Sequence, residues 1–373
     1  MEIRVRKHLL DFERESYVTD CEEEGLRVEE GTAYLDCSLG INPFGYSKEI
    51  NSARRQFLEY KDVNRYPDYP YNRLKKLLIE YWKEVAYLDV PNIKIGCGSI
   101  GIIANINKLF IDSGIKTLGY CPQFTDFMVE VKCCNGIYEY ILLKPDNNYR
   151  FNSSELISAM TREHRLVYID NPNNPTGQVI PVSEIKSIAE QARKMDVCVL
   201  VDEAYGDFMD EQNSAISLVN DYDNVLVARS FSKGFGLAAY RVGYLITGER
   251  IGKYYSKIDY PFAVSAPAEV IVCSVLKDKG FISSSRKSIY DIKKKIVESC
   301  SKISVLETDM SIPIMALSHP NKNIDLYSEF KKRGILTEPG EAYVGLGKNS
   351  VRLRVSKEAY QISSAIKDIE SEI

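Results

Sequence analysis

The chain has few of the residues that most metal enzymes and disulfide-rich proteins need. Only three of its 373 residues are histidine, and His8, His164 and His319 are not spaced as a pair of metal ligands. A zinc or non-haem iron enzyme is therefore not expected. The nine cysteines are scattered without a CxxC spacing. We expect them to be reduced residues of a cytoplasmic protein rather than a disulfide framework.

Long hydrophobic runs and an excess of positive charge are also missing. No apolar stretch approaches the roughly 18 residues of a membrane-spanning helix, and the charged first residues do not resemble a secretory signal. Lys and Arg number 48 and Asp and Glu number 52, so the net charge is −4. A nucleic-acid-binding protein usually has a basic balance or a basic stripe. We therefore expect neither a membrane nor a nucleic acid as partner.

What the sequence does contain, from about Ile93 onward, is an alternation of short apolar runs with amphipathic stretches. This pattern is typical of an α/β fold with a mostly parallel, buried sheet. The predicted strands are 93–95, 117–120, 138–142, 166–170, 198–202, 224–229 and 242–247, and the predicted helices are 100–112, 123–134, 153–160 and 182–195.

The pattern changes after about Ser265, and the length of the chain allows two domains. A long helical region over 266–300 precedes separated strands at 312–316, 335–337 and 351–355 and then a terminal helix. This order predicts a smaller α+β domain. The first 35 residues lack the alternation and are assigned to it as well. We predict a large domain over 36–265 and a small domain built from 1–35 and 266–373.

One glycine-rich segment allows three interpretations. Residues 96–101 match GxGxxG, follow a predicted strand and open a predicted helix, as a dinucleotide fingerprint requires. A dehydrogenase would also place an acidic residue at the end of the next strand, but that strand runs into Cys121 and Pro122. The segment could be only a capped turn. Alternatively, the helix-start amides of Gly98, Ser99 and Ile100 could hold a single phosphate.

Three further motifs end successive predicted strands, at the sheet edge where α/β proteins bind ligands. They are Asp-Asn-Pro-Asn-Asn-Pro-Thr-Gly at 170–177, Val-Asp-Glu-Ala-Tyr at 201–205 and Ser-Phe-Ser-Lys-Gly-Phe-Gly at 230–236. Lys233 could be a desolvated amine whose lowered pKa permits Schiff-base chemistry, or a solvated charge. Asp202 could need a cationic partner in a partly buried site, or could cap a helix.

Together the motifs resemble those of the fold-type-I pyridoxal-phosphate (PLP) enzymes. The resemblance is to class I/II aminotransferases of the histidinol-phosphate aminotransferase and threonine-phosphate decarboxylase branch. It extends from Asp36 to Val355 and rests on the order and spacing of Asn-Asn-Pro-Thr-Gly, Asp-Glu-Ala-Tyr and Ser-x-Ser-Lys. It implies a large domain in which helices sandwich a mostly parallel, mixed sheet, a smaller α+β domain, and PLP as cofactor.

The resemblance also implies roles for individual residues around the PLP ring. Lys233 would form the internal aldimine with the cofactor aldehyde and move the substrate proton. Asp202 would pair with the pyridinium nitrogen. Tyr205 and Asn174 would hydrogen-bond to the ring hydroxyl oxygen, and Phe124 would stack on the ring.

For the cofactor phosphate, the resemblance implies a set of donors that includes the glycine-rich segment. These residues are Gly98, Ser99, Ile100, Ser230, Ser232 and Arg241. In the family, the residue matching Tyr66 reaches the phosphate of the neighbouring subunit. This implies a homodimer with shared active sites, although the Tyr-Pro-Asp sequence could also be only a turn.

The substrate residues are predicted with one departure from the family. Arg352 resembles the arginine that grips the α-carboxylate, with Arg354 as the alternative, and Asn42 is expected to line the substrate mouth. Histidinol-phosphate enzymes carry a further arginine where this chain has Thr337 and Glu338. We therefore expect an amino acid without a phosphate. Glu338 could attract a basic amino acid such as arginine or lysine, or could point to solvent beside a turn.

The predicted activity is transamination of an L-amino acid to its 2-oxo acid. Decarboxylation, elimination or oxidative deamination of an amino acid, including a basic one, could occur on the same scaffold, because the cofactor motifs do not determine which bond breaks. Two other interpretations assign the protein to a different functional class. One is a nicotinamide dehydrogenase built on residues 96–101, and the other is a catalytically idle PLP scaffold.

Overall fold

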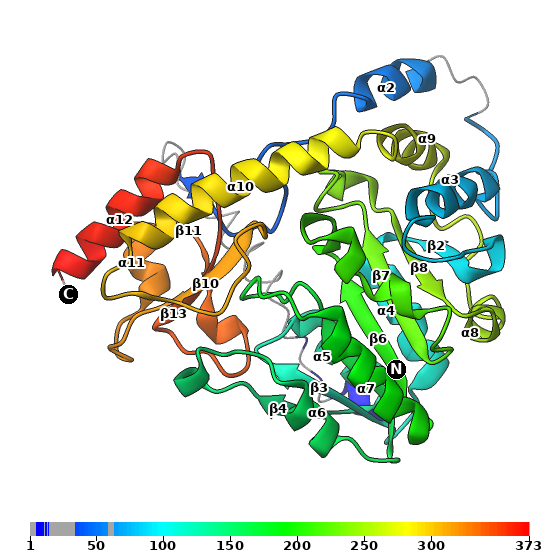
Figure 1. Ribbon diagram of the computed structural model, residues 1–373, viewed down its shortest axis with the longest axis horizontal. Coiled ribbons are helices and arrows are strands. Elements are labelled where there is room, and N and C mark those ends of the chain that lie inside the picture. The colour runs from blue at the N-terminus through cyan, green and yellow to red at the C-terminus, as the bar shows by residue number, and fades with distance from the viewer. Residues whose placement is uncertain (1–4, 11, 13, 15–33, 59–62, 373) are drawn as a thin grey trace, which may run out of the picture.

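The computed structural model describes residues 5–10, 12, 14, 34–58 and 63–372. Figure 1 shows a large sheet enclosed by helices and, beside it, a smaller unit formed by the C-terminal part of the chain. Most of residues 1–35, which were predicted to join the small domain, lie outside the described residues.

The large sheet has seven strands in the order β2-β8-β7-β6-β5-β3-β4. Strand β8 runs antiparallel to its neighbours β2 and β7, and the other pairs are parallel, so the predicted mostly parallel sheet is confirmed. The strands are β2 (Ile93–Gly96), β3 (Lys116–Cys121), β4 (Ile137–Leu142), β5 (His164–Asp170), β6 (Cys198–Glu203), β7 (Val225–Ser230) and β8 (Gly243–Thr247).

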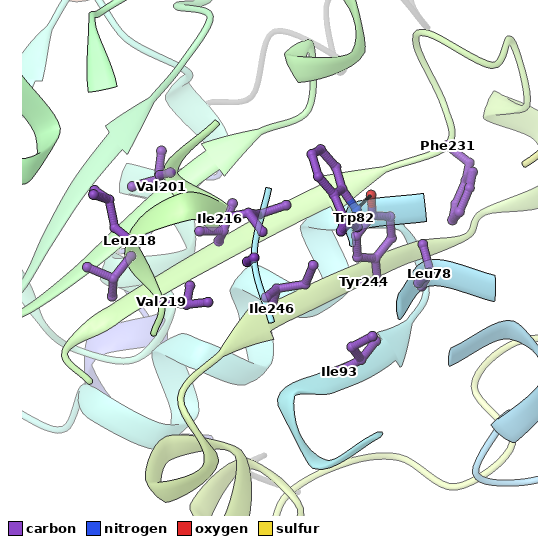
Figure 2. Close-up of a cluster of buried hydrophobic side chains, with 14 of the residues drawn as sticks. Leu78, Trp82, Ile93, Val201, Ile216, Leu218, Val219, Phe231, Tyr244 and Ile246 are labelled. Atoms are coloured by element: carbon purple, nitrogen blue, oxygen red, sulfur yellow. Dashed lines mark hydrogen bonds between the residues drawn. The ribbon is translucent and has the colours of Figure 1, made fainter. Parts of the chain in front are cut away.

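Side-chain alternation along the central strands creates two cores, one on each face of this sheet. On β6, Val199 and Val201 belong to one core and Leu200 to the other. Figure 2 shows part of the first core, where Trp82 and Tyr244 lie close together. Helices on that face are α3 (Asn72–Trp82), α6 (Ser153–Ala159), α7 (Val182–Lys194) and α9 (Ala266–Val275); on the other are α4 (Gly98–Phe110), α5 (Thr125–Cys133) and α8 (Glu249–Tyr255).

The smaller unit has its own core and two small sheets. An antiparallel sheet has the order β12-β13-β10-β9, and β1 pairs in parallel with β11, which brings the N-terminal segment to the C-terminal part of the chain. These strands are β1 (Leu35–Asp36), β9 (Ser304–Val305), β10 (Ile314–Ser318), β11 (Ile335–Leu336), β12 (Glu338–Pro339) and β13 (Ser350–Arg354). The α-helices of the described residues that have not yet been given are α2 (Ile50–Leu58), which packs in the larger core, α10 (Lys279–Ser299), α11 (Leu326–Lys332) and α12 (Ala359–Glu372).

The predicted helical region over 266–300 is in fact two helices, α9 and α10. They separate at Asp278, whose carboxylate accepts a hydrogen bond from the N–H of Phe281 (3.1 Å) and caps α10. The buried side chains of α9 pack in the larger core, not in the smaller one. The domain boundaries stay a prediction, and by packing the large unit continues past residue 265. Among the described residues, no helix has the length and apolar character needed to cross a membrane.

Candidate active site

A cavity of about 500 Å³ lies at the carboxyl ends of β5, β6 and β7. Parallel strands place their C-terminal residues at the same edge, so motifs far apart in sequence meet there. The predicted residues that line the cavity are Ser99, Ile100, Phe124, Asn174, Asp202, Tyr205, Ser230, Ser232, Lys233 and Arg241. Arg14, Asp126, Asp170, Pro172, Ala204 and Ala238, for which no role was predicted, also line it.

Lys233 follows β7 and faces the ring of Tyr205, with Nζ 5.6 Å from the ring centroid. Burial lowers the pKa of Lys233 to about 8, and the positive charges of Arg352 and Arg241 act in the same direction. The chain around Gly40 covers this pair, since a Cβ atom there would lie 1.8 Å from the Tyr205 hydroxyl and 3.7 Å from Nζ. Lys233 is therefore a desolvated amine in a closely packed setting.

Asp202 is buried at the end of β6 and receives hydrogen bonds from neutral groups. The Tyr168 hydroxyl donates to its Oδ2 and the Ala204 N–H to its Oδ1, each at 3.0 Å. Burial raises the pKa of Asp202 to about 7, and the nearby charge of Asp170 adds to the effect. A cation placed against this carboxylate from the cavity would stabilise its charged form.

Asp170, in the neighbouring position on β5, organises the loops around the cavity. Its Oδ2 accepts hydrogen bonds from the N–H groups of Phe124 (3.2 Å) and Asn174 (2.9 Å), both of which line the cavity. Side chains that donate to its Oδ1 are Tyr120 (2.7 Å), Asn173 (3.0 Å) and Gln123 (3.2 Å). Sequence reasoning placed Asp170 in a motif but gave it no role.

The predicted phosphate donors meet where α4 begins. Arg241 Nη1 donates to Ser232 Oγ at 3.2 Å, and Ser230 Oγ donates to Ser232 Oγ at 2.8 Å. Gly98 has φ +69°, and a Cβ atom on it would lie 2.6 Å from Arg241 Nη2. The amino end of α4, two hydroxyls and a guanidinium thus surround one position, an arrangement suited to an anion.

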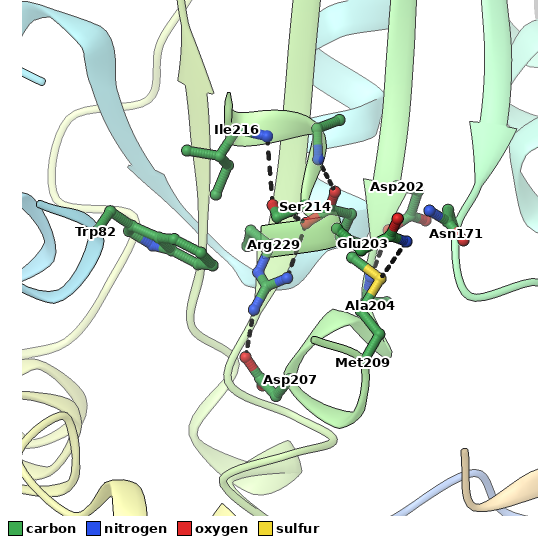
Figure 3. A network of polar contacts seen from close by, with 12 residues as sticks. Trp82, Asn171, Asp202, Glu203, Ala204, Asp207, Met209, Ser214, Ile216 and Arg229 are labelled. Atoms are coloured by element: carbon green, nitrogen blue, oxygen red, sulfur yellow. Dashed lines mark hydrogen bonds and ion pairs between the residues drawn. The ribbon is translucent and has the colours of Figure 1, made fainter. Parts of the chain in front are cut away.

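A second polar network, shown in Figure 3, lies next to Asp202 on the opposite face of the sheet. Arg229 on β7 is 1% exposed and donates to Glu203 Oε2 (2.8 Å) and Asp207 Oδ1 (2.5 Å). Asp207 packs against Gly234, where a Cβ atom would lie 2.2 Å from the Asp207 Cβ. The network therefore joins the residue after Asp202 to the residue after Lys233. Sequence reasoning missed it.

Arg352 lies on β13 in the smaller unit, outside the residues that line the cavity, but it contacts one of them. Its Nη1 donates to Asn174 Oδ1 at 3.0 Å. Arg354, the alternative, is held by backbone carbonyls, those of Val355 (3.2 Å) and Asp36. Arg352 is thus the better placed of the two arginines to reach a ligand in the cavity.

Glu338 is found in neither of the two positions that we expected, the substrate mouth or the solvent. It is 1% exposed on β12, directly opposite Arg352 on β13, and its Oε2 lies 3.4 Å from Arg352 Nη2. The cross-strand register between β12 and β13 produces this pairing. Glu338 therefore contacts Arg352 and lies outside the residues that line the cavity.

Known proteins resemble this chain in sequence and in fold. The chain matches the family model described as Aminotransferase class I and II over residues 33–369. The chain belongs to the class I and II aminotransferases. A histidinol-phosphate aminotransferase of Clostridium novyi is 33% identical over 70% of this chain and 71% of its own length. One of Methanococcus maripaludis is 27% identical over 89% and 88%.

Solved structures agree on the fold. The histidinol-phosphate aminotransferase of Sinorhizobium meliloti, solved in complex with pyridoxal-5'-phosphate, has a TM-score of 0.84, covers 100% of this chain and 99% of its own, and is 21% identical. Its fold is the fold-type-I architecture predicted above. The protein is a PLP-dependent aminotransferase.

The cavity of this aminotransferase fits PLP in three respects. Lys233 provides a buried amine. Asp202 provides a buried carboxylate that accepts hydrogen bonds from two neutral groups, the Tyr168 hydroxyl and the Ala204 N–H. The start of α4 provides an anion site. The anion site depends on Gly243 on β8, since a Cβ atom at that position would lie 2.4 Å from the carbonyl carbon of Gly98. When bound, PLP serves as an electron sink for the substrate carbon.

Asn42 and Tyr66 lie outside the residues that line the cavity. We expected Asn42 at the substrate mouth, but its amide donates to the carbonyl of Gly234 (2.9 Å) and its oxygen accepts from the N–H of Phe44 (2.9 Å). It thus ties the N-terminal loop to the residue after Lys233. Tyr66 is 79% exposed and stacks on Phe262 at 4.7 Å between ring centroids.

Proposed function

We propose that this aminotransferase moves the amino group of an L-amino acid onto a 2-oxo acid, with Lys233 as the residue that binds the cofactor aldehyde and carries the substrate proton. The joint position of Lys233 and Asp202 supports the proposal, since the two groups line one cavity from neighbouring strands. Burial brings the pKa of Lys233 down to about 8 and that of Asp202 up to about 7. Near neutral pH a fraction of the Lys233 amine is uncharged, as a nucleophile and base must be.

The other cavity residues would hold the cofactor in place. Asp202 would keep a proton on the ring nitrogen, and Tyr205 and Asn174 would hydrogen-bond to the ring hydroxyl oxygen. Phe124 would cover the face of the ring. The phosphate would bind to Ser99, Ile100, Ser230, Ser232 and Arg241 at the amino end of α4.

The substrate proposed is an amino acid without a phosphate. Arg352 would bind its α-carboxylate through paired hydrogen bonds. Because Glu338 lies 3.4 Å from Arg352, the pair carries little net charge, and a second anionic group on the substrate would face a buried carboxylate. Decarboxylation, elimination and oxidative deamination remain as alternatives that analysis of the product separates.

The proposal includes a homodimer in which Tyr66 reaches the phosphate site of the partner subunit. Tyr66 is 79% exposed, so its ring is available for such a contact. Phe262, which stacks on Tyr66 and is 42% exposed, extends the apolar surface there. The cytoplasmic location predicted from the cysteines stays a prediction.

A labelling experiment tests the position of Lys233. Reduction of the PLP-loaded enzyme with borohydride should fix the cofactor to the peptide that contains Lys233. Lys293 is a matched internal control, because burial lowers its pKa to about 7 as well, yet it lies on α10 and donates to the backbone carbonyls of the smaller unit. Label on Lys293, or on any lysine except Lys233, would reject the assignment.

A substrate screen then tests the reaction. The enzyme should convert a free L-amino acid to the 2-oxo acid of the same carbon number and aminate an added 2-oxo acid, as measured by mass spectrometry of both products. Loss of carbon dioxide, or consumption of oxygen without amination of an acceptor, would instead support one of the alternatives.

A further inference from the structure

Arg352 already has two acceptors on each of its terminal nitrogens. Nη1 donates to Asn174 Oδ1 (3.0 Å) and to the Tyr343 hydroxyl (2.6 Å). Nη2 donates to the carbonyl of Ser38 (2.5 Å) and contacts Glu338 Oε2 (3.4 Å). A substrate carboxylate that binds both nitrogens must therefore displace at least one acceptor from each of them.

Two of the acceptors are fixed by the surrounding structure. Glu338 is directly opposite Arg352 in the β12–β13 ladder. The backbone N–H of Asn174 is bound to Asp170 at 2.9 Å, which anchors the loop that carries its side chain. The strand pair thus holds the backbone of Glu338, and the bond to Asp170 holds the backbone of Asn174, next to Arg352.

Tyr343 is attached differently. It lies between the short 3₁₀ turn Gly340–Ala342 and β13, in a stretch that also contains Gly345 and Gly347. Gly345 has φ +95°, a conformation that glycine adopts without strain, and a Cβ atom on it would lie 3.3 Å from Leu142 of the larger unit. The loop thus reaches from the smaller unit to the larger one, and turn hydrogen bonds hold it: the Tyr343 N–H donates to the Gly340 carbonyl, and the Tyr343 carbonyl accepts from the Leu346 N–H.

The phenol of Tyr343 also contacts Asn174, which lines the cavity. Its hydroxyl donates to Asn174 Oδ1 at 3.4 Å while it accepts from Arg352 Nη1, so it bridges the arginine and a residue that lines the cavity. Tyr343 itself is fully buried. A neutral phenol oxygen therefore accepts from the same guanidinium nitrogen that donates to Asn174, a residue that lines the cavity.

We propose that Tyr343 determines how strongly the aminotransferase binds carboxylates, because its hydroxyl takes up a donor of Arg352 that the substrate carboxylate needs and releases it when the substrate binds. The inference rests on the proposed function, in which Arg352 binds the α-carboxylate. In the free enzyme the phenol keeps a buried guanidinium hydrogen-bonded. A carboxylate displaces it because a charge-assisted hydrogen bond is stronger than a neutral one.

Replacement of the hydroxyl tests this directly. Tyr343→Phe keeps the ring and removes the competing oxygen, so the PLP-loaded variant should bind propionate, a carboxylate that cannot react, at least three times more tightly than the wild type in isothermal titration calorimetry. The KM for the amino acid substrate should fall in parallel. Tyr360→Phe, at a side chain that is 84% exposed on α12, is the control and should bind propionate like the wild type.

Each other outcome has a definite meaning. Weaker propionate binding by Tyr343→Phe would show that the phenol is a ligand of the carboxylate, and unchanged binding would show a purely structural role; both overturn the proposal. Arg352→Lys separates this inference from the proposed function. If that variant binds propionate like the wild type, Arg352 is not the carboxylate site and the substrate assignment itself fails. Tyr343→Leu provides the same comparison if Tyr343→Phe does not fold.

Discussion

Asp170 and Asp202 show how two similar residues receive different functions from their hydrogen bonds. They are paired in register at the ends of β5 and β6, and both are buried. Asp170 accepts from two backbone N–H groups and three side chains, whereas Asp202 accepts from one backbone N–H and one hydroxyl. Asp170 is therefore engaged in holding loops, and Asp202 retains capacity for a ligand.

The Asp202→Asn substitution should remove the charge that keeps the ring nitrogen protonated. We expect kcat to fall roughly 10³-fold, which corresponds to about 4 kcal/mol in the activation barrier. Asp221→Asn, at an exposed position, should leave kcat unchanged. A near-normal kcat for Asp202→Asn in steady-state assays would mean that another group protonates the ring.

The same substitution should change the stability of the cofactor-free protein in a pH-dependent way. Burial raises the pKa of Asp202 from 3.8 to about 7, so between these values the native state holds a proton that the unfolded chain has lost. The contribution of Asp202 to stability therefore falls as the pH rises through this window. For the apo proteins, the Tm of Asp202→Asn minus the Tm of the wild type should be larger at pH 8 than at pH 5. An equal difference at the two pH values would contradict the raised pKa.

Glu338 gives a prediction about substrate charge. Glu338→Gln removes the carboxylate that offsets the charge of Arg352, so acidic amino acids should gain relative to basic ones. We expect the ratio of kcat/KM for arginine to that for glutamate to fall at least tenfold, about 1.4 kcal/mol. Glu341→Gln, three residues away and exposed, is the matched control. If the wild type already prefers glutamate or aspartate to arginine and lysine, the prediction of a basic substrate is wrong.

At the scale of elements, the strands β6 and β7 carry the site on one face and its support on the other. Asp202 and Ser230 point to the face that holds the cavity, whereas Glu203 and Arg229 are opposite each other in register on the other face. Arg229 Cζ also lies 4.9 Å from the centre of the Trp82 ring. The network thus fixes the ends of two neighbouring strands.

Arg229→Met should accordingly be strongly destabilising. It leaves the buried carboxylates of Glu203 and Asp207 without their shared cation, a change that typically costs about 3–5 kcal/mol. Arg250→Met is the comparison, because Arg250 is exposed and lies 3.8 Å from an exposed Asp223, and such surface pairs contribute at most about 1 kcal/mol. Urea unfolding of the apo proteins measures both. Similar losses for the two variants would refute the role of the network.

The sequence predicted the elements of the large sheet well and those of the smaller unit less well, for a physical reason. Long apolar runs between amphipathic helices determine parallel strands locally, and their ends necessarily meet at one edge. The strands β9 and β12 have two residues each, too short for any periodicity, and the Glu338–Arg352 pair depends on the register of β12 with β13. Arg229 did leave a signal, a charge inside an apolar strand opposite Glu203, but only the register connects the two.

At the scale of the whole molecule, the main prediction concerns assembly. Tyr66 is 79% exposed and lies outside the residues that line the cavity of its own chain, so a role at a phosphate requires a second subunit. Analytical ultracentrifugation should therefore show a dimer at working concentrations, and Tyr66→Phe should weaken PLP binding. A monomer would refute the shared site.

Mixed subunits give the sharper test of this assembly. In a hybrid of a Lys233→Ala chain with a Tyr66→Phe chain, one site receives both substitutions and the other receives neither, provided that Tyr66 crosses to the partner. Mixing the two weakly active proteins should then restore activity, up to half of the wild-type value per dimer. If Tyr66 instead served the cavity of its own chain, every site in the hybrid would carry one substitution and no activity would return. Because both chains keep their fold and surface, recovery of activity reports only which subunit supplies Tyr66.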